Sequence, residues 1–120
     1  MYKVLIVDDD PSILELNRDI FEESNYQVST AENGKIALEK TTDTAFDLIV
    51  TDLIMPEMGG LDFICALKDS GIDTPIIVVT GDESETLGIV EGMADAVFPK
   101  PYTHQELSYA ADLILKNKAS

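Results

Sequence analysis

Near the middle of the chain lies the stretch Asp47-Leu48-Ile49-Val50-Thr51-Asp52-Leu53-Ile54-Met55-Pro56. Its apolar run is typical of a buried strand, and Pro56 prevents that strand from continuing far beyond Asp52. An aspartate at the end of such a strand lies at the edge of a core, where an uncompensated charge costs several kcal/mol. We therefore expect other parts of the chain to supply groups that compensate the charge of Asp52.

Outward from this stretch, apolar runs alternate with segments of helical periodicity. The predicted strands are 3–7, 26–30, 46–51, 76–79 and 96–98, and the predicted helices are 10–24, 33–40, 61–68, 85–91 and a last one from 103. Continuous apolar strands indicate burial on both faces, and the alternation indicates parallel strands with helices on each side. The predicted fold class is therefore α/β, a doubly wound five-stranded parallel sheet with five helices, and residues 1–120 are predicted to form one domain.

Several helix boundaries and faces can be predicted from local chemistry. Asp10 can cap the first helix, with Pro11 in its first turn, and Thr103 can cap the last helix in a capping box with Glu106. The expected inward faces are Ile13, Leu16 and Ile20; Ile36 and Ala37; Leu61, Ile64, Cys65 and Lys68; and Leu107, Ala110, Ala111 and Ile114. Cys65, the single cysteine, is accordingly predicted to be a small core residue rather than a redox group.

The charge and hydropathy of the chain exclude some functional classes. The net charge is −15, from 23 acidic and 8 basic residues, so binding of this domain to nucleic acid is not expected. The amino-terminal apolar run is too short for a signal peptide, and no stretch approaches membrane-spanning length. A cytoplasmic location without membrane attachment is therefore expected.

The working groups of a doubly wound fold lie at the carboxyl ends of its strands. In this chain those ends carry Asp8 and Asp9, Asp52, Thr80 and Lys100. Two carboxylates about 4 Å apart repel each other by roughly 4 kcal/mol at an effective dielectric constant near 20, so the cluster needs cations. Lys100 offers one charge, and a hard divalent ion such as Mg²⁺ would supply the remainder.

This constellation suggests chemistry at phosphorus. A carboxylate beside Mg²⁺ and a lysine can act as a nucleophile and become an aspartyl phosphate. The metal and the lysine would stabilise charge on the transferring phosphoryl group, and the hydroxyl of Thr80 could donate a hydrogen bond to it. A hydroxyl that reorients toward a new dianion would also provide a simple switch.

The chain resembles the receiver domains of bacterial two-component response regulators over essentially its whole length. The residues that carry the resemblance are Val7-Asp8-Asp9-Asp10, Asp52-Leu53-Ile54-Met55-Pro56-Glu57-Met58-Gly59-Gly60, Thr80-Gly81 and Pro99-Lys100-Pro101-Tyr102. The first and third are weak signals alone, but the four motifs in this order and at this spacing are highly specific. The resemblance implies a flavodoxin-like sheet with strand order 2-1-3-4-5.

The resemblance also implies roles for individual residues. Asp52 would accept a phosphoryl group from a phosphohistidine on a sensor histidine kinase or a phosphotransfer protein. Asp8, Asp9, Asp52 and the backbone carbonyl of Ile54 would hold Mg²⁺, for which Mn²⁺ can substitute, while Thr80 and Lys100 would bind phosphoryl oxygens. The only catalysis expected is this self-catalysed transfer and a slow autodephosphorylation. The Lys100–Pro101 peptide bond is often cis in the family.

The chain departs from the family pattern at several positions. The family usually has an aromatic switch residue three positions before the lysine; Val97 stands there, and the neighbouring Phe98 could take over part of that role. The interval from Thr80 to Lys100 is about two residues shorter than usual, which indicates a short or mobile fourth helix. Gly59 stands where an aspartate often caps the third helix.

Two positions near the expected phosphate bear on its lifetime. The side chain of Ile54 cannot orient an attacking water, and Asp82 could repel or position one. We expect a phosphoryl state that lasts longer than in fast chemotaxis-type receivers.

The sequence leaves two other functional readings open. Asp8-Asp9-Asp10-Pro11-Ser12 also matches the D-x-D-x-[ST] opening of haloacid-dehalogenase-like phosphatases, although the chain is short for that fold and the stretch from Asp52 to Gly60 would then have no role. Alternatively, the chain could be a binding module that keeps the fold and ignores phosphorylation.

The route by which a signal leaves the domain is less determined by the sequence. If the chain is complete, we expect no DNA-binding or enzymatic output domain after the last helix, and output would be protein–protein, whereas in a longer protein the missing part would decide it. The expected surface comprises the fourth helix, the fifth strand and the fifth helix, where a downstream protein target or a second copy could bind. Thr80, Val97, Phe98 and Tyr102 are the candidate switch and output residues, and Tyr109 and Leu113 are further candidate contacts.

Overall fold

The central strand of the fold is the apolar run that ends at Asp52. In a computed structural model, which describes residues 1–55, 57–81 and 86–119, the strands are β1 (Lys3–Val7), β2 (Gln27–Ala31), β3 (Leu48–Asp52), β4 (Ile76–Thr80) and β5 (Ala96–Pro99). They form one parallel sheet in the order β2-β1-β3-β4-β5, with β3 in the centre. Every residue of β3 and β4 is buried, as expected for strands covered on both faces. The predicted fold class and strand order are confirmed.

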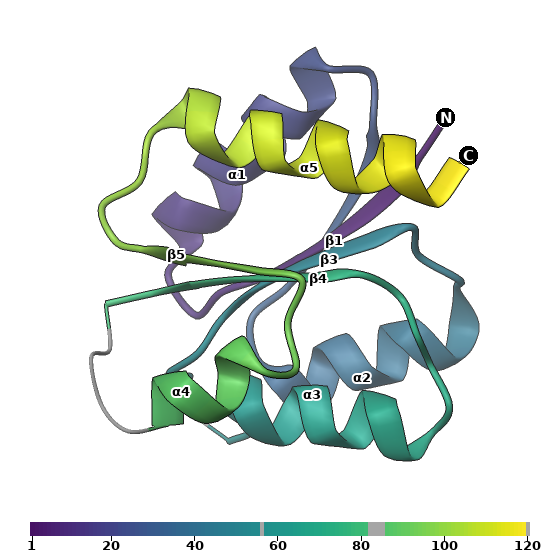
Figure 1. Ribbon diagram of the computed structural model, residues 1–120, viewed down its shortest axis with the longest axis vertical. Coiled ribbons are helices and arrows are strands. Elements are labelled where there is room, and N and C mark those ends of the chain that lie inside the picture. The colour runs from purple at the N-terminus through teal and green to yellow at the C-terminus, as the bar shows by residue number, and fades with distance from the viewer. Residues whose placement is uncertain (56, 82–85, 120) are drawn as a thin grey trace.

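Five helices cover the two faces of this sheet. They are α1 (Pro11–Glu23), α2 (Gly34–Asp43), α3 (Gly60–Asp69), α4 (Thr86–Glu91) and α5 (His104–Ala119). Figure 1 shows α1 and α5 together on one face and α2, α3 and α4 on the other. Each layer encloses its own apolar cluster: Phe21 and Leu107 belong to the cluster under α1 and α5, and Phe63 and Leu67 to the cluster under α2 and α3.

The predicted helix starts are largely confirmed. The Asp10 carboxylate accepts a hydrogen bond from the Ser12 N–H at 2.9 Å, and Pro11 is the first residue of α1. The Thr103 hydroxyl accepts from the Glu106 N–H at 3.1 Å at the start of α5. Gly59 precedes α3 and, lacking a side chain, provides no side-chain cap. The helix α4 has six residues, as expected for a short fourth helix.

Two predicted helix faces, those of α3 and α1, need correction, and the predicted face of α5 is confirmed in most of its residues. Cys65 and Lys68 are exposed rather than buried, and the buried residues of α3 are Gly60, Phe63, Ile64 and Leu67. In α1, Leu16 is 54% exposed, while Asn17, Ile20 and Phe21 are buried. In α5, Leu107, Ala111 and Leu115 are buried, and the predicted Ala110 and Ile114 are half-buried beside them.

The sheet register brings the functional side chains to one edge. Val7 lies beside Thr51 in the pairing of β1 with β3, so Asp8 and Asp52 follow at neighbouring positions. Thr80 lies beside Pro99 in the pairing of β4 with β5, and Lys100 comes next. Among the helices of the described part of the chain, none is both long and apolar enough to cross a membrane.

Candidate functional site

Asp52 lies where the central strand reaches the carboxyl edge of the sheet. It is 7% exposed, and its Oδ1 accepts a hydrogen bond from the backbone N–H of Leu53 at 2.7 Å. The backbone then turns into the segment before α3, where the Gly60 N–H donates to the Leu53 carbonyl at 2.8 Å. The carboxylate is therefore held by its own strand and by the turn that follows it.

Two further carboxylates come from the end of β1. Asp8 is 1% exposed, and its Oδ1 accepts from the Asp10 N–H at 2.9 Å, so the turn that leads into α1 fixes its orientation. Asp9 is exposed to solvent. One carboxylate oxygen from each of Asp8, Asp9 and Asp52 lies within 4.8 Å of the other two. Three hard oxygen donors at this separation suit a small divalent cation such as Mg²⁺.

Lys100 completes the cluster from the end of β5. Its Nζ lies 3.2 Å from Asp8 Oδ2 and 3.1 Å from Asp52 Oδ2. Its backbone N–H donates to the carbonyl of Thr80 at 2.8 Å, which continues the pairing of β4 with β5. The Lys100–Pro101 peptide bond is cis, as the family resemblance led us to expect.

The charges of the cluster are unbalanced, because one ammonium faces three carboxylates. Burial raises the pKa of Asp8, and the charge of Asp52 adds to that rise, while the Asp10 N–H and Lys100 oppose it. Burial would lower the pKa of Lys100, but the hydrogen bonds and charges of Asp52 and Asp8 outweigh it and raise that pKa overall. Lys100 therefore remains protonated at neutral pH. Its single positive charge leaves excess negative charge on the carboxylates, which a bound metal ion would compensate.

The candidate switch residues lie on different sides of the sheet. Thr80 is buried at the end of β4. Val97 packs against the cluster under α2 and α3, whereas Phe98, the next residue of the strand, packs against the cluster under α1 and α5. Any contribution of Phe98 to switching would therefore come from the α5 side rather than from the position of Val97.

The structure gives the solvent exposure of most of the remaining predicted residues. Ile54, two residues after Asp52, is 63% exposed, and its carbonyl as a metal ligand stays a prediction. Asp82 and Pro56 lie outside the described residues. On α5, Tyr109 is 67% and Leu113 is 43% exposed, so both are available on the surface.

The sequence reasoning missed Asn17, which is completely buried on the inner face of α1. Its Oδ1 accepts a hydrogen bond from the hydroxyl of Tyr102 at 3.0 Å. The available signal was a polar residue between Leu14 and Phe21, at helical spacing from both, on a helix that packs against a core.

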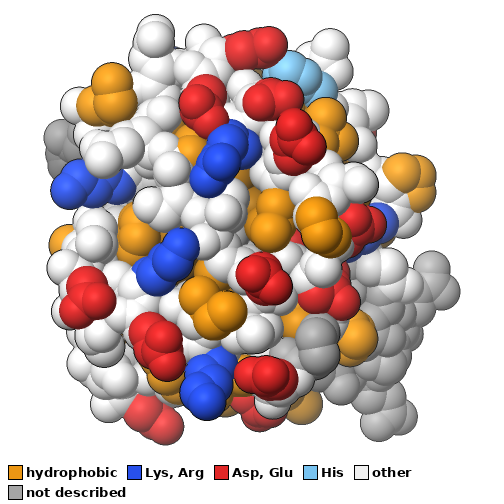
Figure 2. Space-filling view, turned by 180° about the vertical axis from the view of Figure 1, so that it is seen from behind, with side chains coloured by type: hydrophobic (Ala, Val, Ile, Leu, Met, Phe, Trp, Pro, Cys, Tyr) orange, Lys and Arg blue, Asp and Glu red, His pale blue; other side chains and the backbone are white. Residues whose placement is uncertain are grey.

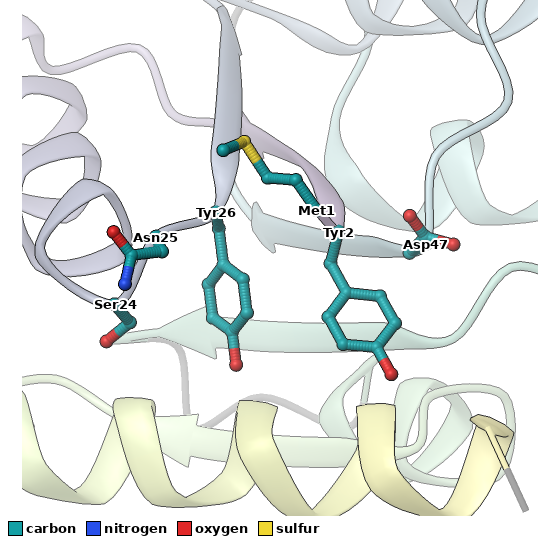
Figure 3. Close-up of a pocket in the computed structure, with 6 residues that line it drawn as sticks. All are labelled: Met1, Tyr2, Ser24, Asn25, Tyr26 and Asp47. Carbon is teal, nitrogen blue, oxygen red and sulfur yellow. The ribbon is translucent and has the colours of Figure 1, made fainter.

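Two further surface features lie apart from the carboxylates: a generally acidic surface and a hollow near the amino terminus. Figure 2 shows acidic side chains spread over the face that it presents, in keeping with the net charge of −15. Figure 3 shows a hollow lined by Met1, Tyr2, Ser24, Asn25, Tyr26 and Asp47, in which the rings of Tyr2 and Tyr26 lie side by side. Because Tyr2 and Tyr26 immediately precede β1 and β2, this hollow lies at the sheet edge opposite to Asp52.

Comparison with known proteins identifies the same family that the motifs suggested. The family model for the response regulator receiver domain matches residues 4–112. Response regulator SaeR of Staphylococcus epidermidis is 36% identical over 89% of this chain and 47% of its own length. The transcriptional regulatory protein CpxR of Escherichia coli is 35% identical over 97% of this chain and 50% of its own length. The chain thus spans about half the length of these curated relatives.

Solved structures agree with the assignment. A Francisella response regulator receiver domain superposes with a TM-score of 0.91 at 29% identity, covering 98% of this chain and 99% of that one. The response regulator TrrA of Thermotoga maritima, solved in complex with Mg²⁺ and BeF, gives a TM-score of 0.87 at 31% identity, covering 95% and 99% of the two chains. On the strength of the matched residues and of this shared fold, the chain belongs to the receiver domains of two-component response regulators.

Proposed function

We propose that this chain is a phosphoacceptor that takes a phosphoryl group onto Asp52 from a phosphohistidine of a sensor histidine kinase or a histidine phosphotransfer protein. The observation that carries the proposal is the position of Asp52, which is nearly buried, has Lys100 Nζ at 3.1 Å and shares its surroundings with two more carboxylates. A carboxylate in a purely structural ion pair would not need the two others beside it.

The residues present fit a magnesium ion. Asp8, Asp9 and Asp52, with the backbone carbonyl of Ile54, would hold it, and all of these groups offer hard oxygen atoms. Mn²⁺, with a similar preference for oxygen ligands, can substitute. When bound, the ion would supply positive charge for the phosphoryl oxygens. The relative TrrA has been solved with Mg²⁺ and BeF, which supports the assignment by analogy.

The protein's own groups account for the remaining chemistry. A carboxylate oxygen of Asp52 attacks phosphorus and forms a new O–P bond, while the P–N bond of the phosphohistidine breaks. The electron pair of that bond stays on the imidazole nitrogen, so the donor histidine is released in its unphosphorylated form. Lys100, already 3.1 Å from Asp52 Oδ2, would bind a phosphoryl oxygen, and the Thr80 hydroxyl would bind another.

The phosphoryl group would change the protein-interaction face of the domain. Before phosphorylation Lys100 is shared by Asp8 and Asp52, and a new dianion on Asp52 would compete for it. Thr80 lies at the end of β4, Val97 and Phe98 lie on β5, and Tyr102 lies in the segment between β5 and α5, so a response at these residues would reach the surface formed by α4, β5 and α5. We propose that a downstream protein target, or a second copy of the chain, binds that surface.

Phosphorylation by a small-molecule donor tests the proposal. The purified chain is incubated with acetyl phosphate or phosphoramidate, with Mg²⁺ or with excess EDTA, and its intact mass is measured over time. We expect the mass of one phosphoryl group to be added only with Mg²⁺, and not in Asp52→Asn, which preserves the shape of the side chain. No mass gain in either the wild type or Asp52→Asn would instead favour a binding module that ignores phosphorylation, and an equal mass gain in both would place the phosphoryl group on another residue.

A further inference from the structure

The pair Asn17–Tyr102 is a polar contact inside an otherwise apolar layer. Asn17 is completely buried between α1 and α5, where its helical neighbours Ile20 and Phe21 are also buried. The Tyr102 hydroxyl donates to Asn17 Oδ1 at 3.0 Å. Burial raises the pKa of Tyr102, so the hydroxyl keeps its proton and remains a donor.

The Asn17–Tyr102 hydrogen bond stabilises the core less than an apolar contact of similar shape would. Asn17 Nδ2 is buried and has no hydrogen-bond partner within the described part of the chain. A buried amide that loses its hydrogen bonds to water and regains only one of them destabilises the fold, and an apolar side chain of similar shape would avoid that cost. A buried polar residue that lowers stability compared with an apolar residue of similar shape suggests a role other than packing.

The position of the pair points to that role. Tyr102 is two residues after Lys100, and Asn17 lies on the helix that begins directly after Asp8, Asp9 and Asp10. The chain from Asp8 to Asn17, the Tyr102 hydrogen bond, the chain back to Lys100 and the ion pair from Lys100 to Asp8 therefore form one closed ring of contacts. Within this ring the hydrogen bond limits how far the segment that carries Lys100 can move from the carboxylates.

We infer that Asn17 and Tyr102 are positioning residues for the phosphoacceptor site, which hold the Lys100 ammonium in register with Asp8 and Asp52. The inference rests on the proposed function, because Lys100 is there assigned to the transferring phosphoryl group. A positioned charge acts on the transition state only if it is held close to its productive place before the reaction. The role that we assign to Asn17 and Tyr102 is to act through Lys100 rather than on the phosphoryl group itself.

The test compares phosphorylation rate with stability in matched variants. Tyr102→Phe removes only the donor, and the double variant Asn17→Leu/Tyr102→Phe replaces both partners by apolar groups of similar shape. We expect initial rates of phosphorylation by acetyl phosphate with Mg²⁺ to fall about fivefold in both, the size of effect that one lost hydrogen bond typically has. We expect the melting temperature of the double variant to be unchanged or higher, since no buried amide then lacks a partner.

The control is Tyr26→Phe. Tyr26 is a half-buried tyrosine whose hydroxyl donates to Asp112 of α5 at the opposite edge of the sheet, so this variant removes an equivalent group far from Lys100. Its phosphorylation rate should equal that of the wild type. A slowing in Tyr26→Phe as large as that in Tyr102→Phe would overturn the inference, because general loosening of the layer under α5 would then explain both.

A double-mutant cycle separates positioning through Lys100 from a structural effect. In a Lys100→Met background, the added Asn17→Leu/Tyr102→Phe change should not slow phosphorylation further, because the group that it positions is gone. Equal fold-slowing in both backgrounds would overturn the inference. Wild-type rates in Tyr102→Phe and in Asn17→Leu/Tyr102→Phe would also overturn it while leaving the proposed function intact, whereas a wild-type chain that takes up no phosphoryl group would refute the proposed function itself.

Discussion

Asp8 is almost completely buried next to a second carboxylate, and burial is the main reason why its pKa is raised. A raised pKa in the folded state means that ionised Asp8 destabilises the fold at neutral pH. The contribution of this group to stability is fully present below its ordinary value of 3.8 and is lost as the pH rises through the folded-state value. At pH 7 ionised Asp8 therefore lowers the free energy of unfolding, and a cation bound at the site would reduce this loss of stability.

We predict that Asp8→Asn is more stable than the wild type in metal-free buffer at pH 7. The expected rise in melting temperature is about 4 °C, which corresponds to about 1 kcal/mol for a domain of this size. The difference should shrink as the pH falls toward 3.8, because the wild-type Asp8 then becomes protonated as well. Differential scanning calorimetry from pH 3.5 to 7 would measure it, and a difference that grows on acidification would contradict the prediction.

Asp9→Asn is the matched comparison for metal binding. Asp9 belongs to the same cluster but is exposed, so its neutralisation should change metal-free stability much less than that of Asp8. We predict that millimolar Mg²⁺ raises the melting temperature of the wild type and has a much smaller effect on both variants, since binding to the folded state alone stabilises it. If Mg²⁺ raised the melting temperature of all three proteins by the same amount, the ion would bind at a site other than these carboxylates.

Ile54 bears on the lifetime of the phosphoryl group. It is 63% exposed beside Asp52 and presents an apolar side chain that cannot orient an attacking water. We predict that Ile54→Asn speeds loss of the phosphoryl group about tenfold, which is less than the roughly hundredfold or more that a general base contributes, because an amide can orient a water but does not take up its proton. Ile54→Val is the control and should retain the wild-type decay. Decay of the wild type within seconds would show that the apolar residue does not protect the acyl phosphate.

At the scale of elements, the start of α3 comes very close to the backbone at the end of β3. A Cβ atom added at Gly60 would lie 2.4 Å from the carbonyl oxygen of Asp52, which is too close for any side chain. The first residue of α3 can therefore be only glycine if the backbone at Asp52 is to stay in place.

We predict that Gly60→Ala lowers the free energy of unfolding by about 2–3 kcal/mol, the usual cost of overpacking, and slows phosphorylation because the backbone of Asp52 must shift. Gly88 in α4 supplies the comparison, since an added Cβ meets nothing within 4 Å there. Gly88→Ala should raise stability by about 0.5–1 kcal/mol. Urea unfolding of both variants would test this, and a neutral Gly60→Ala would contradict the packing argument.

The elements also show how far the sequence could predict the structure. Strands that are apolar throughout, such as 76–79, and helices with a capping residue, such as those after Asp10 and Thr103, were predicted closely because local chemistry determines them. The face of α1 was misplaced because Asn17, a polar residue, lies at the centre of the buried side. The predicted inward set of Ile13, Leu16 and Ile20 therefore includes the exposed Leu16, one position away from Asn17, beside the correctly placed Ile20.

The face of α3 was misplaced for a different reason. The helix carries apolar residues at adjacent positions, Phe63, Ile64 and Cys65, so periodicity alone could not distinguish two neighbouring faces. The approach of Gly60 to the Asp52 carbonyl selects the face that begins with Phe63. That is a tertiary contact, which no local pattern contains.

At the scale of the whole molecule, the candidate site was more predictable than these faces. The rule that parallel strands present their carboxyl ends at one edge is enough to bring Asp8, Asp52, Thr80 and Lys100 together. The sequence could not predict which carboxylate oxygens share the lysine, nor that Tyr102 is tied to Asn17, because both depend on side-chain packing between α1 and the segment before α5.

The central claim concerns which carboxylate accepts the phosphoryl group, since Asp8 also lies 3.2 Å from Lys100 Nζ and is the candidate nucleophile of a haloacid-dehalogenase-like reaction. The most direct measurement is to phosphorylate the chain with acetyl phosphate and Mg²⁺, reduce it with borohydride, which converts an acyl phosphate of aspartate to homoserine, and map the peptides by mass spectrometry. We predict homoserine at position 52 alone. Homoserine at position 8, or at neither position after a confirmed mass gain, would contradict the account.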